Sequence, residues 1–167
     1  MAIKRNPSAS RRYASGLTLA TAKKMLAAAE KEAERLRMPF SIAILDVGGN
    51  LLAFYRMTDA SLAGIQIAQD KAYTAVFSKK PTLWYKGEYT SGELIPLFFH
   101  ERWITFQGGF PLVKNGKVYG GIGASGGRIE DCWVCRVAIE AGGFDVEDID
   151  DVIRAVKKEM AERGKSR

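Results

Sequence analysis

Histidine and cysteine are scarce in this sequence of 167 residues, which has one histidine and two cysteines. Two cysteines cannot build the disulfide framework of a small secreted domain. No apolar run approaches the roughly 20 residues that a membrane-spanning helix needs. The basic N-terminus is not followed by the apolar segment of a secretory signal. We therefore expect a cytoplasmic protein that does not enter a membrane.

An excess of basic residues is confined to the two ends of the chain. The net charge is +6, but without the six basic residues of the ends, 19 basic residues face 19 acidic ones. The sequence also lacks the motifs of helix-turn-helix, zinc-finger and RNP-type domains, so nucleic-acid binding is not expected. We predict a flexible basic arm over residues 1–15 and one domain over residues 16–164. The six basic residues are Lys4, Arg5, Arg11, Arg12, Lys165 and Arg167.

Glycine is abundant between Gly108 and Gly127, where the sequence predicts a β-hairpin. Asn115-Gly116 suits a tight turn because both residues tolerate positive φ. The returning strand carries glycine at positions 120, 121 and 123. Glycine weakens a strand, so this density indicates close approach either of a ligand or of another part of the backbone. The strand-to-helix turn that follows could also receive an anion on its N–H groups.

Hydrophobic periodicity predicts the other elements and an α+β fold. Two hairpins imply an antiparallel sheet of four to five strands, flanked by α-helices. Residues 78–107 show no regular pattern and are rich in aromatic side chains, which indicates a functional or interface segment. The predicted helices are 18–37, 61–77, 129–141 and 146–163, with strands at 40–46 and 51–56.

Few side chains have the chemistry of a catalytic or metal site. Lys71 lies beside the apolar stripe of its helix and is either a functional residue or a surface lysine with a buried stem. His100 is either a metal or haem-iron ligand or an ordinary hydrogen-bonding imidazole. Cys132 and Cys135 share one helical face, which fits two core residues, a redox dithiol or a weak zinc motif.

Two familiar glycine motifs occur without the context that their chemistry needs. Residues 123–127 match G-x-S-x-G, but the one histidine precedes the serine, whereas the hydrolase order places it last. Residues 121–126 match G-x-G-x-x-G, but no βαβ unit with a later acidic residue surrounds them. Neither a hydrolase nor a dinucleotide-binding fold is therefore expected.

Short motifs along most of the chain resemble the GlcG/HbpS-like haem-binding or haem-degrading domain, which also occurs at the C-terminus of PduO-type corrinoid adenosyltransferases. The resemblance implies a profilin-like antiparallel sheet, a homo-oligomer, and a cleft that binds haem, a corrinoid or another small molecule. This chain lacks a histidine in its first helix, where some members could offer an iron ligand. The matching motifs are Ala43–Leu51, Arg56–Ala60, Asp70–Ala75, Gly108–Pro111, Gly120–Gly126 and Asp131.

Three hypotheses follow from these residues and from the resemblance. In the first, the protein binds haem or a related tetrapyrrole, with Arg56 and Lys71 on the ligand carboxylates and Asp59 and Asp131 orienting them. The same four residues could instead form an internal ion-pair network. The second is an enzyme acting on a small oxygenated substrate, with Lys71, His100 or Asp131 in acid–base work; the third is an assembly scaffold. In the first hypothesis, the remaining expected ligand contacts are Gly123 and Ser125, and the aromatic side chains of Trp84, Tyr85 and Trp103 cover a planar ligand.

Overall fold

The computed structural model of the protein describes residues 16–85 and 100–165. The α-helices and strands lie within two residues of their predicted positions, whereas a 3₁₀ helix at Thr82–Trp84 falls in the segment for which no regular structure was predicted. Thr18 caps the first helix by accepting a hydrogen bond from the Thr21 N–H at 3.1 Å. The predicted arm, 1–15, lies outside the described residues. The elements are α1 (Leu19–Leu36), β1 (Ser41–Asp46), β2 (Leu51–Arg56), α2 (Leu62–Ser78), the 3₁₀ helix η2 (Thr82–Trp84), β3 (Gly109–Lys114), β4 (Lys117–Ser125), α4 (Ile129–Ala141) and α5 (Glu147–Lys165).

Both predicted hairpins are present, each closed by the residues expected to close it. The Asp46 carboxylate accepts hydrogen bonds from the N–H groups of Gly48 and Asn50, both at 2.9 Å, and so orders the first turn. Asn115 and Gly116 adopt φ values of 51° and 71°, the left-handed conformation that a type I′ turn requires.

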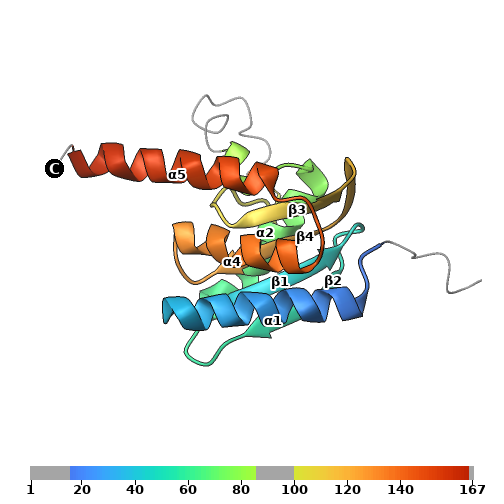
Figure 1. The fold of residues 1–167 in the computed structure, drawn as a ribbon. Coiled ribbons are helices and arrows are strands. Elements are labelled where there is room, and N and C mark those ends of the chain that lie inside the picture. The colour runs from blue at the N-terminus through green and yellow to red at the C-terminus, as the bar shows by residue number, and fades with distance from the viewer. Residues whose placement is uncertain (1–15, 86–99, 166–167) are drawn as a thin grey trace, which may run out of the picture.

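The four strands form one antiparallel sheet in the order β2-β1-β4-β3, which confirms the α+β class. Helix α2 packs on one face, and α1 and α4 pack side by side on the other, as Figure 1 shows. Helix α5 packs against α4 and extends beyond the rest of the domain. No helix of the described part is long and apolar enough to cross a membrane.

The glycine-rich strand β4 is where α2 comes closest to the sheet. A Cβ atom on Gly123 would lie 2.1 Å from the Ala68 carbonyl oxygen, and one on Gly121 would lie 2.6 Å from the Ala72 carbonyl oxygen. Of the two explanations for these glycines, the structure supports close approach of another backbone, because helix α2 occupies the space.

Candidate functional site

A buried ion pair between Lys71 of α2 and Asp131 of α4 lies across the end of β4. The Lys71 Nζ donates to Asp131 Oδ2 at 2.6 Å and to the Ala124 carbonyl oxygen at 2.8 Å. The side chains are 3% and 4% exposed. The alternative of Lys71 as a surface lysine is therefore wrong, since its ammonium group is buried and paired.

The strand-to-helix turn does receive an anion, and that anion is the protein's own carboxylate. Asp131 Oδ1 accepts hydrogen bonds from the N–H groups of Gly126 at 3.1 Å and Gly127 at 2.7 Å. Burial raises the pKa of the Asp131 carboxyl, while Lys71 and the two glycine N–H groups oppose that rise. The pair thus fixes α2, the turn and α4 to one another.

The two cysteines are free and belong to the hydrophobic core. The Cys135 thiol donates to the Gly108 carbonyl oxygen at 3.4 Å. Burial raises the pKa of Cys132 to about 12 and holds the pKa of Cys135 well above its ordinary value. A thiolate is the form that reacts or binds metal, so this environment fits core residues better than a redox or zinc pair.

His100 lies on the surface beside α2. Its ring stacks on Tyr73 with the ring centres 5.6 Å apart, and its Nδ1 accepts a hydrogen bond from the Arg102 N–H at 3.4 Å. Within residues 16–85 and 100–165, no three His, Cys, Asp or Glu side chains are grouped to hold a metal ion. The role of His100 as a metal ligand stays a prediction.

A row of three polar residues crosses three neighbouring strands at the start of α2. Strand register pairs Ser41 of β1 with Arg56 of β2 on one side and with Ser125 of β4 on the other. Directly paired residues in a sheet point to the same face, so the three side chains lie on the α2 side. A Cβ on Gly64, in the first turn of α2, would lie 3.4 Å from Ser41 Oγ and 3.5 Å from Ser125 Oγ. We call Arg56, Ser41 and Ser125 the Arg56 row.

The Arg56 row has unused hydrogen-bonding capacity. Arg56 is exposed, and its Nη1 donates to the Ala60 carbonyl oxygen at 3.2 Å, but none of the described carboxylates forms an ion pair with it. Ser41 Oγ is buried and has no hydrogen-bond partner among the residues that the structure describes. The Ser61 side chain makes no capping bond to the first turn of α2. The row therefore offers the Arg56 cation, the Ser125 hydroxyl and a helix N-terminus to an anion.

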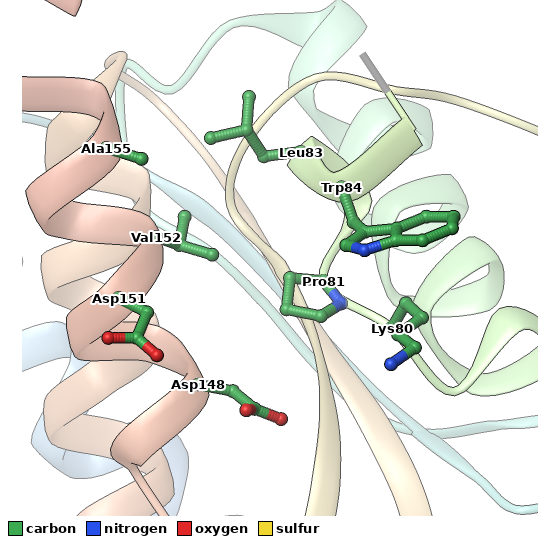
Figure 2. Close-up of a pocket in the computed structure, with 8 residues that line it drawn as sticks. All are labelled: Lys80, Pro81, Leu83, Trp84, Asp148, Asp151, Val152 and Ala155. Atoms are coloured by element: carbon green, nitrogen blue, oxygen red, sulfur yellow. The ribbon is translucent and has the colours of Figure 1, made fainter. Parts of the chain in front are cut away.

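The structure separates the other predicted site residues from one another. Asp59 is exposed in the loop before α2 with φ of 69°, and Gly123 lies beneath α2. Tyr85 meets both tryptophans edge to face, with ring centres 4.9 Å from Trp84 and 5.3 Å from Trp103. Trp84 lines a groove beside α5, shown in Figure 2, rather than the Arg56 row. The aromatic residues Tyr89, Phe98 and Phe99 of the predicted irregular segment lie outside the described residues.

Sequence reasoning missed Ser41 and its place beside Arg56 and Ser125. The serine begins an otherwise apolar strand, which is an ordinary position for a small polar residue. Its unpartnered hydroxyl and its two cross-strand neighbours become visible only with the register of three strands, two of which are far apart in the sequence.

The sequence of this chain matches a known protein family. The model of a family described as "Haem degrading protein HbpS-like" matches residues 17–140. An uncharacterized 15.0 kDa protein of the dhaT-dhaS intergenic region of Citrobacter freundii is 38% identical over 117 residues, which are 68% of this chain and 82% of that protein. The corrinoid adenosyltransferase PduO of Citrobacter freundii is 36% identical over 138 residues, which are 80% of this chain but only 41% of PduO.

A solved structure shares the fold. The crystal structure of a PduOC–haem complex matches with a TM-score of 0.71 and 32% identity, over 75% of this chain and 94% of that one.

Proposed function

The chain belongs to the family of HbpS-like proteins, and from this premise we propose that it binds a small organic molecule through carboxylate groups of that molecule. Haem or a related tetrapyrrole is our candidate, because a protein of similar sequence and fold, PduOC, has been crystallised with haem. The carboxylates in question are the propionate groups that such a tetrapyrrole carries.

One observation carries the proposal, namely the unsatisfied Arg56 row. A guanidinium group binds a carboxylate through charge-assisted hydrogen bonds. The N–H groups at the start of α2 favour an anion in the same place. Ser125 is half-buried, whereas Ser41 is fully buried beneath Gly64, so Arg56 and Ser125 are the members of the row that a ligand reaches from outside. These groups meet at one end of three neighbouring strands, which is the arrangement that a carboxylate needs.

Lys71 and Asp131 have a positioning role in this proposal. Lys71 was expected to contact the ligand, but its ammonium group already binds Asp131 and the Ala124 carbonyl oxygen. The pair holds the turn that follows Ser125, and so it fixes one end of the row. The burial of both side chains also favours binding over an acid–base enzyme, since a substrate would have to displace α2 to reach them.

Titration with haem tests the proposal through the Soret band of the bound haem. We expect Arg56→Gln to weaken binding about fivefold, which corresponds to about 1 kcal/mol for an exposed charge pair. Lys24→Gln, which removes an equal charge from the exposed face of α1, is the matched control and should bind as the unmodified protein does. Haem dimethyl ester, which lacks free carboxylates, should bind the unmodified protein and Arg56→Gln equally.

Two results would contradict the proposal at different points. Absence of any Soret change with the unmodified protein would remove tetrapyrroles as the ligand. Equal haem affinity of Arg56→Gln and Lys24→Gln would leave haem binding intact and remove the Arg56 row from it. The predictions of a homo-oligomer and of a cytoplasmic location stand beside this proposal, and a mass measurement in solution would test the first.

A further inference from the structure

A groove runs between helix α5 and the segment around η2, on a part of the molecule that the Arg56 row does not use. Figure 2 shows its two walls, with α5 on one side and residues 80–84 on the other. Its volume is about 360 Å³, and the Trp84 side chain on its wall is 49% exposed. The lining residues are Lys80, Pro81, Leu83, Trp84, Asp148, Asp151, Val152 and Ala155.

A second cavity continues this groove toward the β3–β4 turn. It has a volume of about 200 Å³ and lies between that hairpin and the first turn of α5, with Gly116 and Glu147 among its lining residues. Asp148 lines both cavities, so together they form one track along the start of α5. We call these two cavities the α5 track.

The α5 track is acidic, because four carboxylates and one lysine, Lys80, are among the residues that line it. Asp145, Glu147, Asp148 and Asp151 all line it. Asp151 forms an ion pair with Arg154 of the same helix. For the other three, the described portion of the chain supplies no ion-pair partner. The ammonium group of Lys80 lies 5.8 Å from the centre of the Trp84 ring, so a cation already stacks on this side chain beside the carboxylates.

We propose that the basic N-terminal segment of the same chain, residues 1–15, lies along the α5 track. The segment contains Lys4, Arg5, Arg11 and Arg12 and no acidic residue. Its charge is therefore opposite to the net charge of the track, in which Asp145, Glu147, Asp148 and Asp151 outnumber Lys80. Single exposed ion pairs are weak and are screened by salt, so the docking depends on the four cations acting together.

The point where this segment joins the domain supports docking within one chain. Gly16 packs on Tyr119 of β4, since a Cβ on Gly16 would lie 2.8 Å from the ring. Tyr119 in turn contacts Phe144, with the ring centres 6.0 Å apart, and Phe144 precedes α5 by three residues. The segment thus begins close to the acidic end of α5.

The length of the segment is sufficient. Fifteen extended residues span up to about 50 Å, whereas a domain of this size is roughly 40 Å across. Arg11 and Arg12, close to the attachment point, would meet the carboxylates of the second cavity, Asp145 and Glu147. Lys4, farther from it, would reach Asp148 and Asp151 beside Trp84.

Trypsin cleavage of the full-length protein tests the docking, because Arg11 and Arg12 are cleavage sites. At 50 mM salt we expect cleavage there to be at least threefold faster in Glu147→Gln/Asp148→Asn than in the unmodified protein. The matched control Glu30→Gln/Glu34→Gln removes two carboxylates from α1 and should be cleaved at the unmodified rate. Carbodiimide, which joins an amine to a carboxylate in contact with it, should link Lys4 to Asp148 or Asp151.

A charge exchange separates docking from a change in α5 itself. Glu147→Lys/Asp148→Lys alone should lose the carbodiimide link of Lys4. Combined with Arg11→Glu/Arg12→Glu, it should gain links between the new lysines and the new glutamates. Equal trypsin rates in all variants, or a missing Lys4 link in the unmodified protein, would overturn the proposal. In a mixture of ¹⁵N-labelled and unlabelled protein, links between labelled and unlabelled chains would assign the track to a second copy and overturn docking within one chain.

Discussion

The Lys71–Asp131 pair allows a quantitative test of the fold, because each partner can be changed with little change of shape. Both side chains are almost fully covered, and the charged atoms lie 2.6 Å apart. Removing one member of such a buried pair leaves an uncompensated charge and costs about 3–5 kcal/mol of unfolding free energy. We therefore expect Lys71→Met and Asp131→Asn each to lose that amount.

The double variant carries the more informative prediction. The asparagine side chain that replaces Asp131 would still accept hydrogen bonds from the N–H groups of Gly126 and Gly127. The methionine side chain that replaces Lys71 would fill the lysine channel with an uncharged chain. Because neither replacement then leaves a buried charge, Lys71→Met/Asp131→Asn should lose about 2–3 kcal/mol less than the sum of the single losses.

Urea unfolding followed by far-UV circular dichroism would measure this coupling, provided that the slope against urea is the same in all variants. The exposed pair Arg35–Glu32, 2.7 Å apart on α1, is the control, and its removal should cost less than about 1 kcal/mol. Strictly additive losses for Lys71 and Asp131, or single losses as small as those of the control, would refute our account of the pair as an internal clamp.

Two further predictions concern the core. Cys132 and Cys135 should resist thiol reagents at pH 8, because burial keeps both thiols protonated. Above about pH 8.5 the free energy of unfolding should fall by about 1.4 kcal/mol per pH unit and per thiol. The reason is that the thiols ionise there in the unfolded chain, whereas the pKa of Cys132 in the folded protein is raised to about 12. The same fall in Cys132→Ala/Cys135→Ala, measured by urea unfolding across pH, would contradict this assignment. Gly123→Ala should cost at least about 3 kcal/mol because the new Cβ would meet the Ala68 carbonyl at 2.1 Å, whereas Gly116→Asn, in an open turn, should cost less than about 1 kcal/mol. Equal urea midpoints for those two variants would show that α2 can move away from the sheet.

Local patterns were sufficient to predict most of the fold. The Asn115-Gly116 pair and the Thr18 cap act on their immediate neighbours, and both behave as predicted. Sequence alone left two explanations for the glycines of β4, because close approach of a ligand and close approach of a helix backbone both require residues without side chains. The structure shows the helix backbone in that space.

The candidate site was harder to predict because its residues meet through long-range pairing. Lys71 is 60 positions from Asp131, and nothing local to Lys71 distinguishes a paired lysine from a surface one. Arg56 and Ser125 were singled out as ligand contacts, but their common neighbour Ser41 depends on the register of β1 with two different strands. A one-residue change of either register would send the side chains to opposite faces.

The absence of side chains at positions 121 and 123 has a lasting effect on how this protein can change. The carbonyl oxygens of Ala68 and Ala72 stand in the gap between α2 and the sheet there, beside Val76 Cγ2, so shortening the surrounding core side chains cannot by itself open it. New ligand preferences in this protein must therefore arise at the margin of the sheet, where strands end and side chains meet water, while its centre stays closed.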